Sequence, residues 1–251
     1  MKVYAYGTDK RTVECGRLLS AESFPGIERA VLLPIPTTRD GVHVLGTEIT
    51  LEELSGKLRP FDLLVGYGVP RELREAAAGV GCAVADVSVD EEFLAQNAAL
   101  TAVGAVARLC GGGELAPKDQ TFGIIGYGRI GERLTHILMF LGARVKVFTS
   151  KKEVRDRLGM LGVCGVDYYS DLEMAKALSD VDVLVNTAPA RIVDDECANI
   201  LSKKRVVELA SGDNFPSSLP VERMPSIPAI DFPKSAAIAL ADSVKRLAAA
   251  T

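Results

Sequence analysis

A chain of 251 residues that is 48% hydrophobic and 25% charged is long enough to bury the core of one large domain or of two small ones. The formal net charge of -4 is small and both signs are mixed along the chain, which argues against a nucleic-acid or anionic-membrane partner. No apolar run approaches the roughly 20 residues of a membrane span, and the first residues resemble a strand rather than a signal peptide. We therefore expect a cytoplasmic protein.

Histidine and cysteine, which build many metal and nucleophilic sites, are few. The two histidines, His43 and His136, are too few for a histidine metal cage or a hydrolase triad, so no metal site is predicted. His136 falls off the apolar stripe of its predicted helix and is expected at the surface, whereas His43 lies in a loop with no partner visible in the sequence. Five scattered cysteines form no C-x-x-C pair and are expected to be reduced and buried: Cys15, Cys82, Cys110, Cys164 and Cys197.

The first part of the chain alternates short apolar runs with helix-like stretches, a pattern typical of a parallel α/β layer. Strands are predicted in "KVYAYG", "AVLLPIP", "DLLVGYG" and "CAVADV". Helical patterns lie around residues 10–20, 51–58 and 70–79. A long helix rich in Ala and Leu is then predicted from about Asp90 to Cys110, ending at Gly111-Gly112-Gly113.

A second α/β series follows, with strands predicted in "TFGIIG", "RVKVFTS", "VDYYS", "VDVLVNTAP" and "RVVELA". The closing residues predict an amphipathic helix with Pro233 near its start, packed back onto the first layer through Ile238, Val244, Leu247 and many alanines. The fold class is therefore α/β: a Rossmann doubly wound parallel sheet plus a smaller α/β domain, linked by long helices. Residues 1–92 and 233–251 are assigned to the smaller, substrate-binding domain, and residues 93–232 to the dinucleotide-binding domain with its linking helix.

A G-x-G-x-x-G loop separates the first strand of the second series from its helix. The motif is short, but this context fits a βαβ unit. Gly126 permits the tight turn, Gly128 lets the backbone approach a pyrophosphate, and Gly131 lets helix and strand pack closely. The phosphates are expected at the helix N-terminus. Cofactor contact is assigned to the whole loop: Gly126, Tyr127, Gly128, Arg129, Ile130 and Gly131. The alternative is a tight structural turn without a ligand.

The next strand ends in Thr149-Ser150-Lys151-Lys152, where an NAD site normally has a carboxylate for the ribose hydroxyls. Hydroxyl groups and cations at this place favour the 2′-phosphate of NADP, so Thr149, Ser150 and Lys151 are assigned to the cofactor. NAD remains the alternative, with the lysines as a solvated helix start.

The fourth strand of this series ends in Asn186-Thr187-Ala188-Pro189. The carboxyl edge of a parallel sheet borders the ligand crevice, so all four residues are assigned to the cofactor site, facing the nicotinamide and its ribose. The alternative is a plain turn, in which Asn and Thr are also common.

These segments together resemble the family of the A-subunit of dipicolinate synthase: the glycine loop, "VKVFTSKK", "VDVLVNTAPARIV" and "IPAIDFPKSAA". The resemblance extends to "AVLLPIPTTRDGVHV" and "LAQNAALTAVGAV", and so covers most of the chain. It implies a hydroxyacid-dehydrogenase-like architecture with a flavodoxin-like first domain. It also implies oxidation of dihydrodipicolinate to dipicolinate with NADP in sporulation, together with a second, flavoprotein-like subunit.

The chain departs from this family at two places. The linking helix has Leu100-Thr101-Ala102-Val103-Gly104 where the family tends to have Pro-Thr-x-Glu-Gly, so a carboxylate is missing. Ser226-Ile227-Pro228-Ala229 replaces the usual Gly-x-Pro-Gly before the last helix. The first domain is also shorter. These departures bear on the substrate more than on the cofactor.

The implied reaction yields an aromatic ring, so it needs mainly positioning, and a strong acid/base pair is not obligatory. The two substrate carboxylates call for cations, hydroxyls or backbone N–H groups. Thr37, Thr38 and Arg39 lie in a loop after a strand of the first domain, where they are candidates to bind one carboxylate. Arg39 beside Asp40 is alternatively an exposed ion pair of small energy.

Three further candidates lie on helices. Lys234 matches the family's Pro-Lys-Thr/Ser-Ala segment and is a candidate second cation or proton relay. Asn97 and Thr101 are four residues apart, on one helix face, and are candidates to line the substrate site. Alternatively, their side chains bind helix carbonyls.

Two other functions remain open at this stage. One is an NADP-dependent dehydrogenase or imine reductase of another small, for example dicarboxylic, acid. The other is a non-catalytic nucleotide-binding subunit. A homo-oligomer, in the form of a symmetric dimer, is expected by analogy with other dinucleotide enzymes.

Overall fold

The computed structural model describes residues 1–111 and 114–249. The chain divides into two compact units: Met1–Leu100 with Pro228–Thr251, and Thr101–Ile227. We call them the first unit and the second unit. The first division falls inside the long helix rather than near its start, where the sequence predicts it. Gly112 and Gly113 of the predicted helix stop lie outside the described residues, as do the last two residues of the predicted smaller domain.

The first unit is built on a four-stranded parallel sheet in the order β1-β2-β3-β4. The strands are β1 (Lys2–Ala5), β2 (Arg29–Leu32), β3 (Asp62–Gly66) and β4 (Ala83–Asp86). β3 is buried along its whole length, because helices cover both faces of the sheet. All four carboxyl ends therefore lie at one edge, where the loops after β1, β2 and β3 begin.

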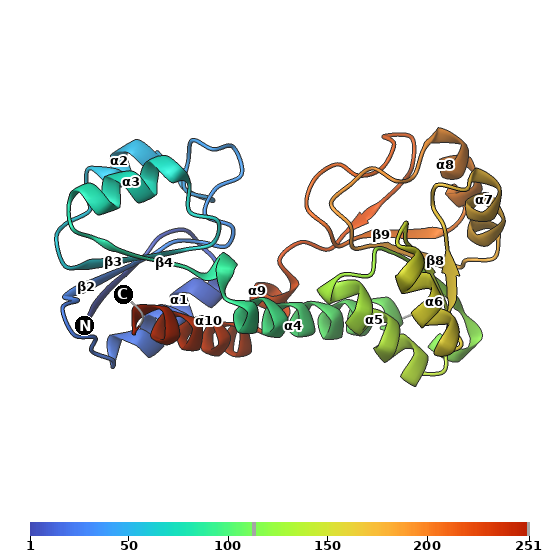
Figure 1. Cartoon of the computed structure of the whole chain (residues 1–251), viewed down its shortest axis with the longest axis horizontal. Helices are drawn as coiled ribbons and strands as arrows, with labels where there is room; N and C mark the ends of the chain where they lie inside the picture. Colours follow the sequence, from blue (N-terminus) through green and yellow to red (C-terminus); the bar gives the residue numbers. More distant parts are fainter. Residues whose placement is uncertain (112–113, 250–251) are drawn as a thin grey trace. The chain divides into compact units, whose positions relative to one another are not determined.

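Two helix pairs cover the two faces of this sheet (Figure 1). One face carries α1 (Lys10–Ser20) and α10 (Pro233–Ala248); the other carries α2 (Leu51–Ser55) and α3 (Arg71–Gly79). Two short helices lie between these elements: η1 (Val87–Val89) follows β4, and α9 (Ile227–Asp231) precedes α10. α10 contacts α1 through fully buried alanines such as Ala237, as expected. The prediction that Ile238 packs onto the first layer is wrong, because its side chain is 54% exposed.

The second unit is built on a six-stranded parallel sheet in the order β10-β9-β8-β5-β6-β7. Numbered from β5, this is the Rossmann order 3-2-1-4-5-6 read from the far edge, and the strand order reverses between β5 and β8. The predicted fold class is thereby confirmed. The strands are β5 (Thr121–Ile125), β6 (Arg144–Phe148), β7 (Cys164–Val166), β8 (Val183–Asn186), β9 (Arg205–Glu208) and β10 (Glu222–Arg223).

Helices cover both faces of this second sheet. α5 (Arg129–Phe140) and the second half of α4 (Glu91–Cys110) pack on one face, and α7 (Asp171–Ser179) and α8 (Asp195–Leu201) pack on the other. α6 (Lys152–Met160) adds Leu158 to the first of these cores, and η2 (Pro117–Asp119) precedes β5. The predicted strand "VDYYS" is misplaced, because β7 ends at Val166 and a turn follows. The short strand β10 has no counterpart among the predicted strands.

α4 is the one helix among the described residues that is long and apolar enough, by length and composition, to cross a membrane. No such segment is expected from the sequence alone. Packing accounts for its composition: Phe93 is buried in the first unit's core, and Ala102, Ala105 and Leu109 in the second unit's core.

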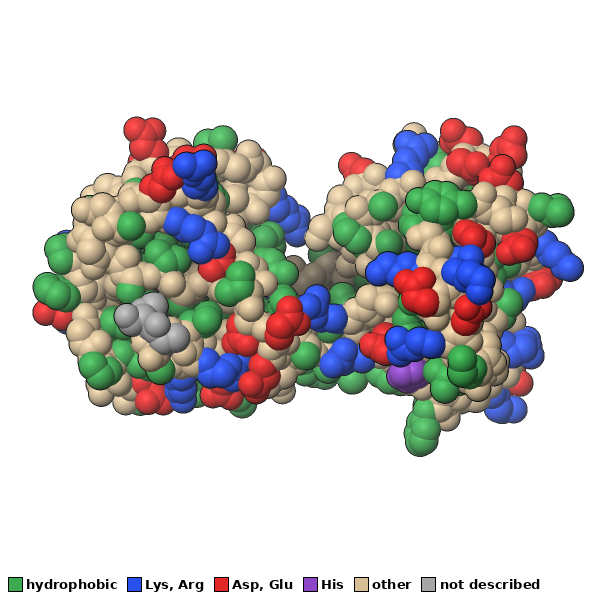
Figure 2. Space-filling view, in the orientation of Figure 1, with side chains coloured by type: hydrophobic (Ala, Val, Ile, Leu, Met, Phe, Trp, Pro, Cys, Tyr) green, Lys and Arg blue, Asp and Glu red, His purple; other side chains and the backbone are tan. Residues whose placement is uncertain are grey.

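The surface and the cysteines agree with the expectations only in part. Lys and Arg side chains are mixed with Asp and Glu over the face shown in Figure 2, as expected from the mixed sequence charges. All five cysteines are free thiols. Cys15, Cys82 and Cys197 are buried as expected, but Cys110 is half-buried and Cys164 is exposed.

Candidate functional site

The glycine loop connects β5 to α5 at the switch point of the Rossmann sheet. Gly126 has φ of 88°, in the left-handed region that favours glycine, and its N–H donates to the Phe148 carbonyl at 2.9 Å. A Cβ on Gly131 would lie 2.2 Å from the Gly126 carbonyl oxygen. These two glycines are therefore required by the fold itself, whether or not a ligand binds.

Gly128 differs from both neighbours. Its φ of -86° is open to any residue, and a Cβ placed on it would meet no atom within 4 Å. The protein therefore gives no internal reason for a glycine here. A close backbone approach to an external group does give one, and this is the role that the dinucleotide motif assigns to the second glycine.

The N-terminus of α5 adds the electrostatic part of this site. Gly128 is the N-cap and has no side chain to cap the helix, so first-turn N–H groups and the positive end of the helix dipole are available to an anion. Arg129 is exposed and Ile130 is half-buried beside them. The Tyr127 ring packs on the core, and its hydroxyl lies 3.4 Å from His136 Nε2. His136 is exposed, as predicted.

The end of β6 supplies hydroxyls and cations. Thr149 is only 6% exposed, and its Oγ1 accepts from the Lys151 N–H at 3.3 Å, so this side chain shapes the strand end. Ser150 Oγ accepts from the Tyr168 hydroxyl at 3.1 Å. Lys151 is exposed at the N-cap of α6, and Lys152 pairs with Asp156 at 2.8 Å.

Arg155 is a further cation here that sequence reasoning missed. Its Nη1 donates to the Thr149 carbonyl at 2.8 Å, and its Nη2 pairs with Asp167 at 2.7 Å. Asp167, which follows β7, is therefore neutralised rather than presented as a free carboxylate. The spacing of Arg155 from the strand end gave no signal, because the contact depends on how α6 lies across β7.

The end of β8 forms a turn in which the polar side chains are hydrogen-bonded within the protein. Asn186 is 2% exposed; its Nδ2 donates to Glu208 and to the Ala188 carbonyl, both at 2.9 Å. Thr187 Oγ1 donates to the Ile125 carbonyl at 2.9 Å and thus joins β8 to β5. Ala188 is half-buried and Pro189 is exposed. Asn186 and Thr187 are therefore hydrogen-bonded within the fold, whereas Pro189 is exposed.

Glu208, at the end of β9, is a second residue that sequence reasoning missed. It is 3% exposed, and burial raises its pKa although hydrogen bonds from Asn214, Asn186 and the Ala210 N–H oppose the shift. Asn214 Nδ2 donates to Glu208 Oε2 at 3.1 Å. This buried carboxyl joins the ends of β8 and β9 beside the switch point.

In the first unit, Thr37 fixes the loop after β2. It is fully buried, and its Oγ1 accepts from the Tyr67 N–H at 3.0 Å, while its carbonyl accepts from the Leu45 N–H at 2.9 Å. Thr37 therefore positions the loop, and the more exposed side chains that follow it are the ones available to a ligand.

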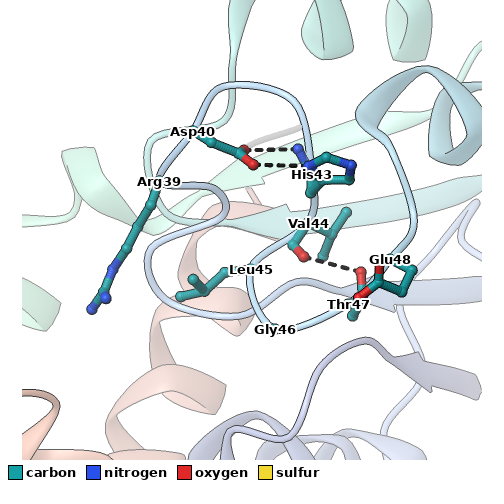
Figure 3. Close-up of a pocket in the computed structure, with 8 residues that line it drawn as sticks. All are labelled: Arg39, Asp40, His43, Val44, Leu45, Gly46, Thr47 and Glu48. Carbon is teal, nitrogen blue, oxygen red and sulfur yellow. Dashed lines mark hydrogen bonds and ion pairs between the residues drawn. The ribbon is translucent and has the colours of Figure 1, made fainter.

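The same loop lines a pocket of about 230 Å³ (Figure 3). His43 Nδ1 lies 2.8 Å from Asp40 Oδ2, which gives His43 the partner that the sequence did not show. The Arg39 side chain points away from Asp40, and Asp40 pairs with His43 instead of forming the alternative Arg39–Asp40 pair (Figure 3). The spacing "DGVH" was the available signal, since Asp in such a turn accepts from N–H groups two and three residues on.

The remaining substrate candidates are distributed over helices. Asn97 Oδ1 accepts from Arg11 Nη1 at 3.2 Å, and Arg11, which is 3% exposed, also pairs with Asp9 at 2.7 Å. Thr101 is buried and belongs to the second unit, whereas Asn97 belongs to the first. Lys234 is exposed in the first turn of α10. Within the described residues, no group of three or more His, Cys, Asp or Glu is placed to hold a metal ion.

Comparison with known proteins defines the class to which this site belongs. Residues 111–215 match the family described as D-isomer specific 2-hydroxyacid dehydrogenase, NAD binding domain. This range holds the glycine loop and the ends of β6 and β8. This part of the chain is thus similar to the NAD-binding domain of 2-hydroxyacid dehydrogenases, which indicates a nicotinamide cofactor.

The chain is also similar to the A-subunit of dipicolinate synthase, the family that its sequence motifs resemble. It is 28% identical to that protein from Bacillus subtilis (strain 168) over 134 residues, a match that spans 50% of this chain and only 44% of the relative's length. The crystal structure of the same protein from Bacillus halodurans superposes with a TM-score of 0.77 at 23% identity, covering 99% of this chain and 97% of the other. D-Lactate dehydrogenase from Escherichia coli gives 0.59 at 15% identity, covering 98% and 96%. At these identities the structures establish the fold.

Proposed function

We propose that the protein is an NADP-dependent oxidoreductase that oxidises dihydrodipicolinate to dipicolinate, in the manner of a dipicolinate synthase. The observation that carries this proposal is Gly128, which faces open space in a dinucleotide loop of a chain related to the A-subunit of that enzyme. The five free cysteines agree with a reducing cytoplasm, where we place the reaction.

The second unit offers a binding site for each part of the cofactor. First-turn amides of α5, around Arg129 and Ile130, would bind the diphosphate beside Gly128. Ser150 and Lys151 would bind the ribose and its 2′-phosphate, and the surface of Ala188 and Pro189 would face the nicotinamide. When bound, the cofactor would supply the acceptor for the hydride that leaves the substrate.

We prefer NADP because the charges at the end of β6 are positive. Lys151 is exposed, and Arg155 neutralises Asp167, the nearby acidic group with which it pairs. A 2′-phosphate gains charge-assisted hydrogen bonds at such a place, whereas a ribose diol loses the carboxylate that normally accepts from it.

For the substrate, the first unit offers exposed cations. Arg39 and Lys234 are both exposed and would each bind a carboxylate of the dicarboxylic acid. Thr38, in the loop of Arg39, is half-buried and its hydroxyl donates to Asp40 at 3.1 Å, so we assign it to shaping this loop. We assign Thr37 and Asn97 to positioning the loops that carry these groups, and Thr101 to the buried side of α4.

The direct experiment measures NADPH formation by the purified protein with NADP and freshly generated dihydrodipicolinate. We expect turnover, a smaller rate with NAD, and a rate that falls about ten-fold or more in Lys234→Ala, the equivalent of one lost charged contact. Lys151→Ala should lower the ratio of the rate with NADP to the rate with NAD. Lys203→Ala, an exposed lysine after α8, is the matched control. Absence of an enzyme-dependent rate, with or without the flavoprotein-like second subunit, contradicts the proposal.

A second candidate substrate class follows from the linking helix. The family carboxylate is absent at Leu100–Gly104, so other small dicarboxylic acids and imines belong in the same assay. Turnover of one of these, without turnover of dihydrodipicolinate, supports the broader dehydrogenase. NADPH binding without any turnover supports a non-catalytic subunit.

We also propose two partners. The relation to one component of a two-component synthase supports a second, flavoprotein-like subunit, and the class of dinucleotide enzymes supports a homo-oligomer such as a dimer. Light scattering of the protein alone measures the homo-oligomer, and co-purification with the co-expressed flavoprotein measures the other partner.

A further inference from the structure

The loop after β2 holds a histidine–carboxylate pair, His43 and Asp40, that has no role in the proposed function as described so far. The pair lies in the pocket of Figure 3, in the loop that starts from the carboxyl end of β2. In open parallel sheets this edge is where ligands bind. His43 and Asp40 are partly exposed there, with side-chain exposures of 43% and 55%, so a small molecule has access to them.

Asp40 is held rigidly in this turn. Its Oδ1 accepts from the Val42 and His43 N–H groups, each at 2.9 Å, and from the Thr38 hydroxyl at 3.1 Å. Its Oδ2 is thereby aimed at His43 Nδ1, 2.8 Å away. A carboxylate so placed keeps the proton of a neutral imidazole on Nδ1 and leaves the lone pair on Nε2.

The loop itself is anchored to the fold on both sides of His43. The Val44 N–H donates to the Ile49 carbonyl at 2.9 Å, and the Leu51 N–H donates to the Val42 carbonyl at 2.8 Å. Thr37 ties the other side of the loop to Tyr67. In Figure 3 the ring nitrogen remote from Asp40 points away from that carboxylate. The His43–Asp40 pair is therefore held in place by the loop on both sides.

We propose that His43 Nε2 accepts the proton that leaves the substrate ring during oxidation, with Asp40 as its positioning residue. This inference rests on the proposed function. The oxidation removes one hydride and one proton from a dihydropyridine: the hydride goes to the oxidised nicotinamide cofactor, the proton goes to Nε2, and the electron pair of the bond to that proton completes the aromatic ring. His43 then releases its proton to solvent.

The charges around His43 suit this role. The hydrogen bond to Asp40 raises the pKa of His43 above its ordinary 6.5, and the carboxylates of Glu48 and Glu53 add to the shift, so the imidazolium formed by proton transfer is stabilised. Arg39, on the rim of the same pocket, is the cation available to the substrate. Oxidation needs the neutral imidazole, so kcat/KM must rise with pH through the pKa of His43.

The test compares His43→Gln, Asp40→Asn and His136→Gln. We expect His43→Gln to lower kcat by about 10²–10⁴-fold and to remove the rise of kcat/KM with pH. Asp40→Asn should move that rise to lower pH, because the group that raises the pKa is gone. His136→Gln, the other histidine, should leave both unchanged. NADPH affinity and melting temperature, measured on each variant, separate this effect from loss of cofactor binding or of folding.

A second measurement does not depend on turnover. With only two histidines, the ring signals in an NMR titration are assigned by the two His→Gln variants. We expect the His43 pKa to lie above 6.5 and to change when dipicolinate is added. Wild-type turnover with an unchanged rate and pH profile in His43→Gln overturns the inference alone. Absence of wild-type turnover overturns the proposed reaction and, with it, the part of His43 in it.

Discussion

At the scale of single residues, three glycines of one motif do different work. Gly126 and Gly131 are fixed by a left-handed φ and by a 2.2 Å approach to a backbone oxygen, so the fold needs them. Gly128 has neither constraint. Two glycines of this six-residue motif are therefore required by the fold, and the third is open to a ligand. Substitutions can test these two roles separately.

Gly128→Ala and Gly131→Ala form a matched pair. In Gly131→Ala the new methyl group meets the Gly126 carbonyl, and we expect a loss of stability of about 1–3 kcal/mol in chemical denaturation. In Gly128→Ala we expect a loss below about 1 kcal/mol, as for an N-cap substitution, but an NADPH affinity at least about ten-fold weaker. Calorimetric titration measures the affinity. Unchanged affinity in Gly128→Ala contradicts the assigned diphosphate site.

At the scale of elements, the ends of β8 and β9 are joined by one buried carboxyl. Glu208 accepts from Asn186 at 2.9 Å and from Asn214 at 3.1 Å, and its side chain is almost entirely removed from water. Burial therefore raises its pKa against the effect of these bonds. Folding therefore disfavours the charged form relative to the unfolded chain, which makes the stability of this edge of the sheet depend on pH.

The sign of this dependence follows from linkage. A carboxyl group with a raised folded-state pKa contributes stability below its unfolded pKa and loses that contribution as pH rises through the folded pKa. We expect the unfolding free energy of the wild type, relative to Glu208→Gln, to fall as the pH rises above the ordinary carboxyl pKa of about 4. Urea denaturation at a series of pH values measures it. Glu173→Gln, on the exposed face of α7, controls for the loss of one charge, and a pH-independent difference contradicts the assignment.

At the scale of the whole molecule, the two ends of the sequence meet in one core. α10, the last helix, packs on α1, the first, and both share a core with β2 and β3. The first unit is therefore incomplete until the chain has passed through the second unit and returned. Leu240 is 1% exposed in this contact, whereas Ile238, two residues earlier, is 54% exposed.

Leu240→Ala and Ile238→Ala test this arrangement. We expect Leu240→Ala to cost about 2–5 kcal/mol, because it leaves a cavity in the core. Ile238→Ala should stay within about 0.5 kcal/mol, as an exposed substitution does. Hydrogen exchange should show that Leu240→Ala weakens protection in β2 and β3, although these strands lie far earlier in the sequence. Equal effects of the two variants would contradict the packing described for α10.

The periodic parts of this fold could be predicted from the sequence. The predicted helix around residues 10–20 coincides with α1, and the four apolar runs of the first series each overlap a strand. The prediction of a strand in "VDYYS" is wrong. Its two tyrosines favour a strand by propensity, but the chain turns after Val166 and brings Asp167 to Arg155. The prediction that Ile238 is buried is wrong because alanines, not this larger side chain, form the close contact of α10.

The sequence by itself determined the motif of the candidate site, since glycine spacing and a non-acidic strand end are local features of the chain. Only the tertiary structure decided which polar side chains are available. Asn186, Thr187 and Thr37 are engaged with backbone or carboxyl groups from other elements, and His43 acquires Asp40 through the shape of one turn. The physical reason is that a hydrogen-bonding group is defined by its partners, and partners distant in sequence are brought together only when the chain folds.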